Sequence, residues 1–310
     1  MKNILQIIII SLVFVGTLSA QSFEKIVLNE SDELGGYYLA MKPIDSIAGV
    51  LVLFPTRGYS PETVFIGTKI QNLGWANGLL TIAVSAGESF YADSESVNNL
   101  NKTLEDIKER YNVKSNDFII GGFGGGGMIG LRYAEYCFEK PDEFPIKPKA
   151  VFALDPAVDL INLWYYFERE IANGISEVGI KEAKYVLDEL KKSIGDLENN
   201  LETYKELTPF YTRDKNIGNE QFLKDIPVRL YYDVDLEWFL ENKLRSAYDL
   251  NFLDGSELIK RLRVLGNENA EFIQATGKGF RFNGERHPHS WSILDEPEFI
   301  TWTKEILSEK

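Results

Sequence analysis

The sequence contains very few of the side chains that bind metals or form disulfides. Its 310 residues include one cysteine and two histidines. A single cysteine cannot form a disulfide within the chain, and two histidines with one thiol leave little from which a zinc site could be built. We therefore expect no metal and no cofactor.

Basic residues are also scarce relative to acidic ones. Lysine and arginine together number 33 against 47 aspartates and glutamates, which gives a formal net charge of −14. Such a surface repels phosphate backbones and anionic lipids, so nucleic-acid binding and docking on anionic membranes are excluded as main functions. Hydrophobic residues at 44% and charged residues at 26% are typical of globular proteins, and no repeat or low-complexity linker interrupts the chain.

The first twenty residues have the features of a secretory signal peptide. Lys2 precedes an almost entirely apolar run at residues 4–15, and Ala20 supplies a small residue before residue 21. The run is too short to cross a bilayer, whereas its length suits a signal sequence. We expect export to the periplasm or the extracellular space, with no membrane span after cleavage. An uncleaved N-terminal anchor is the alternative.

Apolar runs and helical patterns alternate along residues 21–310, which predicts a single α/β domain. Short apolar runs suited to buried strands occur at residues 37–41, 49–54, 79–84, 118–120, 150–154, 227–232 and 270–275. Segments of helical spacing follow most of them, which predicts an open, mostly parallel sheet flanked by helices. Residues 159–222 lack buried strands and are rich in helix formers, so we expect a helical insertion without a core of its own.

Chemistry-bearing residues gather where the predicted strands end. Ligands of open α/β sheets bind beyond the carboxyl ends of the strands. Four such ends carry glycines, charged residues or histidines, namely residues 55–58, 121–127, 233–235 and 287–289.

The order of these segments resembles the α/β-hydrolase family, in which a strand and a glycine-rich turn precede a helix, and an acid and a histidine follow later. The resemblance covers residues 37–307. It implies an α/β-hydrolase fold with residues 159–222 as a helical lid, and it implies hydrolysis of small esters or peptides. The family pattern is Gly-x-Ser-x-Gly, and the matching stretch here is Gly-Phe-Gly-Gly-Gly at residues 122–126. Gly124 therefore stands at the nucleophile position and has no side chain.

The resemblance also assigns the acid and the base of the site. Asp235 lies where the family places its acid, and Asp233 is its competitor two residues earlier. Either aspartate could instead cap the helix that follows. His289, in the stretch His-Pro-His-Ser-Trp-Ser, is favoured over His287 as the base.

Four further residues complete the predicted site. By resemblance, the oxyanion hole takes one backbone N–H from Gly125 and a second from Thr56 or Arg57. Arg57 is also a candidate to bind a substrate carboxylate, with a surface ion pair as the alternative. Trp164, the first of four consecutive aromatic residues that open the insertion, is a candidate to bind substrate, and we expect some of the four to line a pocket under the lid.

Two other sites fit the residues less well. Residues 122–127 match the dinucleotide-binding pattern Gly-x-Gly-x-x-Gly, but at least two predicted strands precede them, whereas that pattern belongs to the first βα unit. His287, His289 and Asp235 could form part of a metal site, although Pro288 restricts the backbone between the histidines.

Two functions therefore remain open. In the first, the protein is a pseudo-hydrolase that binds a small ester or peptide ligand without cleaving it. In the second, it is an active hydrolase in which His289, oriented by Asp235, activates water directly. Gly124 favours the first function, and the retained acid and histidine favour the second. The oligomeric state is left open.

Overall fold

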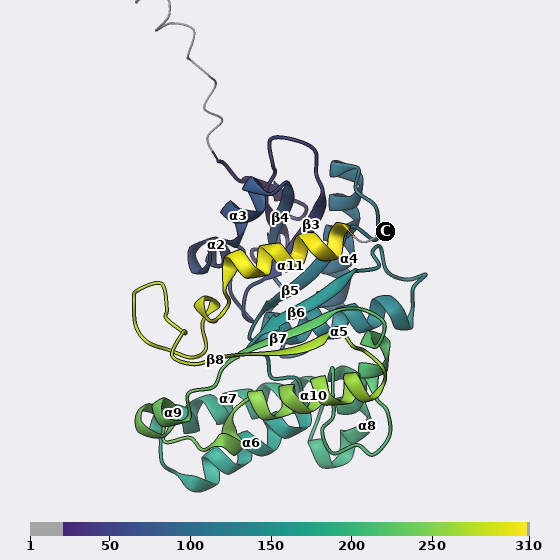
Figure 1. The fold of residues 1–310 in the computed structure, drawn as a ribbon. Helices are drawn as coiled ribbons and strands as arrows, with labels where there is room; N and C mark the ends of the chain where they lie inside the picture. The colour runs from purple at the N-terminus through teal and green to yellow at the C-terminus, as the bar shows by residue number, and fades with distance from the viewer. Residues whose placement is uncertain (1–20, 309–310) are drawn as a thin grey trace, which may run out of the picture.

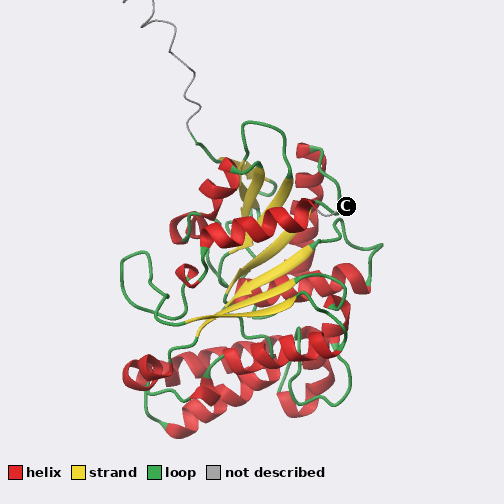
Figure 2. Ribbon diagram, viewed as in Figure 1, coloured by secondary structure: helices red, strands yellow, loops and turns green. Residues whose placement is uncertain are grey.

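A computed structural model describes residues 21–308 and shows an eight-stranded, mostly parallel sheet with helices on both faces (Figures 1 and 2). The predicted signal segment, residues 1–20, lies outside the described residues. The pairs β1–β2 and β2–β4 are antiparallel, and the other adjacent strands are parallel. Across the sheet the strands are β1 (Glu24–Val27), β2 (Tyr37–Met41), β4 (Leu79–Val84), β3 (Gly49–Phe54), β5 (Phe118–Phe123), β6 (Ala150–Leu154), β7 (Val228–Asp233) and β8 (Ala270–Ala275).

Two helical layers cover the sheet because its central strands are apolar on both faces. In β3, Val50, Val52 and Phe54 pack on one layer, while Leu51 and Leu53 pack on the other, as the alternation of side chains along a strand requires. Figure 1 shows α11 on the near side of the sheet and α4 and α5 behind it. The first layer contains α4 (Ser94–Tyr111), α5 (Gly125–Glu139) and α10 (Phe252–Val264), and the second contains α2 (Glu62–Gly67), α3 (Ile70–Ala76) and α11 (Glu296–Ser308).

A third group of helices lies beyond the sheet, at the bottom of Figure 1. The prediction that this insertion has no core of its own is wrong, because Trp164, Phe167 and Leu190 belong to a separate buried apolar cluster that also takes in Met128 of α5. The apolar stripes of two amphipathic helices bury each other there. The group comprises α6 (Leu160–Asn173), α7 (Glu177–Ser193), α8 (Leu197–Leu207) and, after β7, α9 (Leu236–Lys243).

Short 3-10 turns complete the described chain, and the last of them directly follows the loop of His289. They are η1 (Asn219–Leu223), η2 (Ala247–Asp249) and η3 (Trp291–Ile293). Within residues 21–308, none of the helices combines the length and the apolar character that crossing a bilayer would require.

Helix α5 approaches the end of β3 so closely that its first turn must be glycine-rich. A Cβ added to Gly126 would lie 2.0 Å from the carbonyl oxygen of Pro55. The helix begins at Gly125, directly after the turn, because this packing outweighs the low helix propensity of glycine.

Replacing Gly126 with alanine should therefore lower the free energy of unfolding by about 1–3 kcal/mol, the usual cost of forcing an extra methyl group into packed structure. Gly125→Ala is the matched control, since its Cβ would first meet the Arg57 side chain, at 3.1 Å. Urea unfolding of both variants checks this, and equal losses would show that the contact with Pro55 is not limiting.

Candidate active site

Gly124 forms the sharp turn between β5 and α5. Its backbone angles are φ +56° and ψ −122°, a combination that residues with a side chain rarely adopt. Its N–H donates to the carbonyl oxygen of Leu154 at 2.8 Å, and its own carbonyl accepts from Met128 at 3.1 Å. Gly124 thus occupies a strand-to-helix turn with the geometry that a nucleophile elbow requires.

His289 and Thr56 converge on the place where a side chain at position 124 would begin. A Cβ on Gly124 would lie 2.9 Å from Nε2 of His289 and 2.8 Å from Oγ1 of Thr56. In a serine hydrolase, this space holds the nucleophile between the base and the attacked carbonyl. Here the imidazole and the hydroxyl group crowd it, and even a methyl group would require one of them to move.

The carboxylate that contacts His289 belongs to Asp155. Nδ1 of His289 lies 2.7 Å from Oδ2 of Asp155, and the imidazole packs on the ring of Phe123 with 4.2 Å between centroids. Asp155 directly follows β6, has φ +45°, and is tied to β7 by donating its N–H to Tyr231 O at 2.8 Å. A carboxylate at Nδ1 favours a proton on that nitrogen, so Nε2 faces Gly124 as an acceptor.

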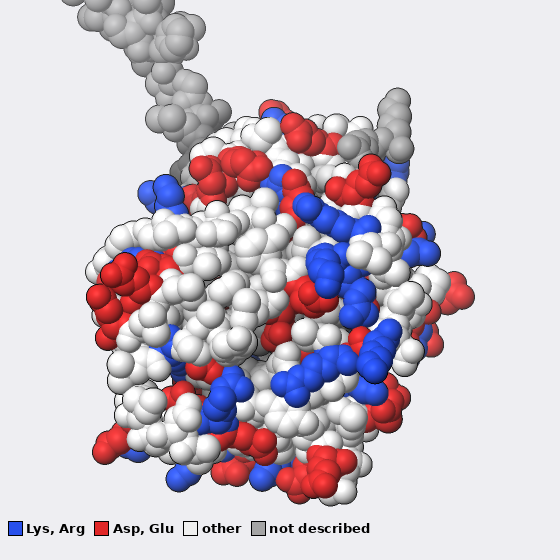
Figure 3. Space-filling model, turned by 60° about the horizontal axis from the view of Figure 1, so that its bottom comes forward, with Lys and Arg blue, Asp and Glu red and all other residues white. Residues whose placement is uncertain are grey.

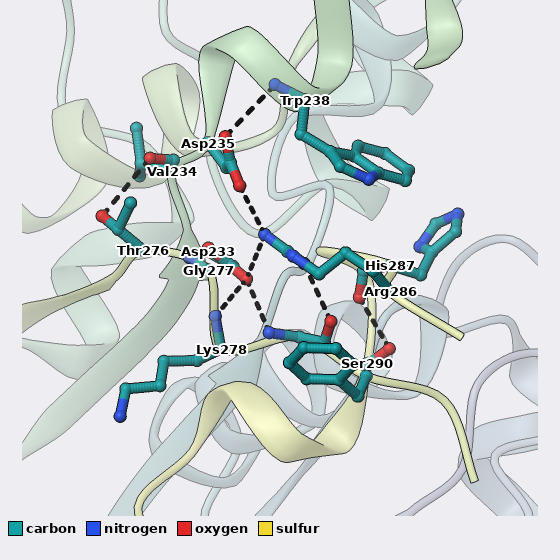
Figure 4. Close-up of polar contacts among 12 residues, drawn as sticks. Asp233, Val234, Asp235, Trp238, Thr276, Gly277, Lys278, Arg286, His287 and Ser290 are labelled. Carbon is teal, nitrogen blue, oxygen red and sulfur yellow. Dashed lines mark hydrogen bonds and ion pairs between the residues drawn. The ribbon is translucent and has the colours of Figure 1, made fainter. Parts of the chain in front are cut away.

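The prediction that Asp235 orients His289 is therefore wrong. Asp235 instead caps α9, where its Oδ1 accepts from the N–H of Trp238 at 3.2 Å. Its Oδ2 forms an ion pair with Arg286 at 2.7 Å, as Figure 4 shows. Asp235 therefore has the helix-capping role that was its alternative, and its other carboxylate oxygen is engaged by Arg286.

Asp233, the other candidate acid, anchors the segment that leads to His289 (Figure 4). Its carboxylate is fully buried and accepts three backbone N–H groups, from residues 277–279, at 2.7–3.0 Å. Nη2 of Arg286 lies 3.0 Å from the same carboxylate. Both aspartates at the end of β7 thus hold the loop, and the carboxylate after β6, that of Asp155, is the one that reaches His289.

His287 points away from Gly124. Its Nδ1 accepts from the N–H of His289 at 3.1 Å, and its ring meets that of Trp238 edge-on at 5.2 Å. Together with the engagement of Asp235 by Arg286, this arrangement does not assemble the alternative metal site. No group of three metal-ligating side chains occurs anywhere in residues 21–308.

Acid should destabilise the protein through His287. Burial, and then the charge of Arg281, lower the pKa of this imidazole to about 3, well below the ordinary value of 6.5. A folded-state pKa below the unfolded one means that the stabilising contribution is complete above pH 6.5 and is lost as the pH falls toward 3. We expect His287→Gln to shift the midpoint of acid unfolding to lower pH. An unchanged midpoint would contradict this assignment.

The predicted oxyanion donor already faces a protein group. The N–H of Gly125 points at Oγ1 of Thr56 from 3.4 Å. Arg57 lies beside this position at the surface. It donates to Glu88 O at 2.9 Å and to the hydroxyl of Tyr185 on α7 at 3.1 Å. Arg57 therefore connects the loop after β3 to the helical insertion.

Trp164 packs in the core of the insertion and not at the elbow. It is 4% exposed, and its ring meets that of Tyr204 edge-on at 5.7 Å. Its neighbours Tyr165 and Tyr166 do line a pocket. Neither Gly124 nor His289 lines this pocket, and the individual choice of Trp164 is wrong because its side chain is buried in the core of the insertion.

Asp155 is the site residue that sequence reasoning missed. The available signal was its place directly after a buried strand, together with the position of Arg286 three residues before His289. Arg286 competes with the histidines of its loop for the carboxylates of Asp233 and Asp235 at the end of β7.

Comparisons with known proteins concern the sequence first and then the fold. No family model and no curated protein match the sequence. Solved structures match over nearly the whole chain. One of two esterases from the fungus Rhizomucor miehei is 15% identical, with a TM-score of 0.59 over 93% of this chain and 85% of that one. Carboxyl esterase 2 of Tuber melanosporum is 17% identical, with a TM-score of 0.55 over 94% and 88%.

A peptidase matches in the same way. The acylaminoacyl peptidase of Pyrococcus horikoshii is 16% identical, with a TM-score of 0.58 over 96% of this chain and 44% of that one. At these identities the likeness concerns the fold, and it agrees with the strand order and with the turn at Gly124. The chain has the α/β-hydrolase fold.

Proposed function

We propose that this protein is an exported pseudo-hydrolase, which binds a small ester-like or peptide-like ligand without forming an acyl-enzyme. The observation that carries the proposal is Gly124, a glycine at the strained strand-to-helix turn, with Nε2 of His289 2.9 Å from the place of its missing Cβ. Covalent acyl transfer requires a nucleophilic side chain at that point, and glycine supplies none.

Two further contacts argue against efficient chemistry. The space beside Gly124 is shared by the Thr56 hydroxyl, which also stands before the N–H of Gly125 that would stabilise an oxyanion. A site without its nucleophile keeps at most roughly 10³- to 10⁴-fold acceleration over water, and that remainder depends on an open oxyanion hole. Because the Thr56 hydroxyl faces this N–H, we expect it to lower the residual rate acceleration further.

The ligand class and the location are parts of the same proposal. The esterases and the peptidase of similar fold support an ester-like or peptide-like ligand. Residues 1–20 support export. The contact between Arg57 and Tyr185 of α7 supports a lid role for the helices between β6 and β7, because it joins them to the loop beside the elbow.

Hydrolysis of p-nitrophenyl acetate and butyrate by residues 21–310 tests the proposal. We expect the wild-type protein and His289→Ala to give the same rate as each other and as buffer. A wild-type rate that clearly exceeds that of His289→Ala would overturn it.

One observation favours an active hydrolase as the second candidate. His289 contacts Asp155 at 2.7 Å, and its side chain is 35% exposed, so a water molecule can reach it. Direct activation of water would show as steady ester hydrolysis without an initial burst, reduced in both His289→Ala and Asp155→Asn. Under the first candidate, neither substitution changes the rate.

A further inference from the structure

A pocket opens between α6 and the start of α10. Figure 3 brings the bottom of the molecule forward and shows acidic and basic side chains side by side on that face. The volume of the pocket is about 160 Å³, and neither Gly124 nor His289 lines it. Pockets for drug-sized ligands have roughly 300–1,000 Å³, so this one suits a smaller molecule. One lining residue, Asn251, donates to Asp155 O at 3.3 Å, which places the pocket next to the acid of the elbow site.

Asp254 brings a largely buried carboxylate to this pocket. Its Oδ1 accepts from Asn162 Nδ2 at 2.8 Å and from the hydroxyl of Thr212 at 2.9 Å. Its Oδ2 accepts no hydrogen bond, and no described residue forms an ion pair with it. Burial raises the pKa of this carboxyl, and the bonds from Asn162 and Thr212 and the charge of Arg213 offset only part of that rise.

Arg213 brings a positive charge to the same pocket. Within residues 21–308 it has no carboxylate partner, and its guanidinium lies over the ring of Tyr165 at 5.0 Å. The other arginine of the pocket, Arg169, is already paired with Asp249, at 2.9 Å from Nε. Asp254 and Arg213 thus form no ion pair with each other. A second carboxylate of the lining, Asp159, accepts backbone N–H groups from Ile161, Asn162 and Thr212.

The remaining walls combine aromatic and aliphatic side chains. Tyr165, Tyr166, Leu163 and Leu253 line the pocket. The hydroxyl of Tyr166 is buried, and no described residue hydrogen-bonds to it. A buried hydroxyl without a partner is unfavourable, so this one is expected to bond to a water or a ligand that occupies the pocket.

We propose that this pocket binds a free α-amino acid with an uncharged, apolar side chain. Its ammonium group would bind Oδ2 of Asp254, its carboxylate would bind Arg213, and its side chain would lie against the leucines and tyrosines. A zwitterion of this size matches two opposite charges that are held apart in a small cavity. The proposal does not depend on whether Gly124 prevents catalysis.

Calorimetric titration of the wild-type protein with L-leucine, L-methionine and L-phenylalanine tests the proposal. We expect at least one of them to bind. If L-leucine is that ligand, L-leucinamide and 4-methylpentanoate should bind at least about tenfold more weakly, because each analogue lacks one charged group. No binding of any of the three amino acids would overturn the proposal.

Matched variants locate the site. Asp254→Asn and Arg213→Gln should each weaken binding at least about tenfold, since each removes one charge-assisted bond. Lys260→Gln is the control, because Lys260 lies on the same helix and pairs with Glu257 at the surface. Thermal unfolding shows that each variant is folded. Binding that survives both substitutions would contradict the proposed site.

Discussion

Replacing Asp233 with alanine is expected to lower the free energy of unfolding by about 3–5 kcal/mol, which is the largest effect on stability that we predict. Its side chain is 0% exposed and accepts three backbone N–H groups, from residues 277–279. Alanine would leave these donors without their acceptor inside the protein, and Asp235 would remain as the carboxylate partner of Arg286. The loop that carries His289 depends on this anchor, so amide hydrogen exchange at residues 277–279 should rise as well.

Asp235→Ala is the matched control for that prediction. Asp235 pairs with the same Arg286, but its side chain is 23% exposed, and it otherwise caps a short helix. Loss of a helix cap costs about 1 kcal/mol. Urea unfolding at pH 7 compares the two variants, and equal losses would mean that Asp233 is not the anchor of the loop.

Replacing Gly124 with serine is expected to create ester hydrolysis that depends on His289, with a rate about 100-fold or more above that of the wild-type protein. The new hydroxyl would project into the space beside Nε2, and Asp155 already holds Nδ1 at 2.7 Å. The turn at φ +56° already has the required geometry, although a side chain there should cost about 1–3 kcal/mol of stability.

Two controls separate the chemistry of this variant from its structural effects. Gly124→Ala introduces the same backbone strain and the same Cβ contacts with His289 and Thr56, but it has no hydroxyl, so it should stay inactive. Gly124→Ser combined with His289→Ala should lose the gained rate. Activity in Gly124→Ala, or activity that persists in the double variant, would show that the hydroxyl at position 124 is not the source.

Most of the fold was predictable because the central strands are continuous apolar runs. Residues 49–54, 79–84 and 150–154 match β3, β4 and β6 as predicted. Strand β1, Glu24–Val27, was missed because it is short and exposed at the sheet edge, where no apolar pattern marks it. The core of the insertion was missed because it is formed by helices that meet only in three dimensions.

The acid of the site could not be read from the sequence for a different reason. Asp155, Asp233 and Asp235 all lie at or just after the end of a buried strand, and nothing local distinguishes them. Arg286 decides among them by pairing with the two at the end of β7. The arginine lies 51 residues from Asp235, so only the folded chain brings them together. His289 was predictable because both histidines of the chain lie in a single loop.

The most direct test of the central claim, that position 124 forms a nucleophile elbow without a nucleophile, is intact-protein mass spectrometry after treatment with a fluorophosphonate. Such a reagent bonds covalently to an activated hydroxyl beside a base. We predict no adduct on the wild-type protein and one adduct on Gly124→Ser, at residue 124. An adduct on the wild-type protein that disappears in His289→Ala, for example at Thr56, would show that another residue supplies the nucleophile and would contradict the account.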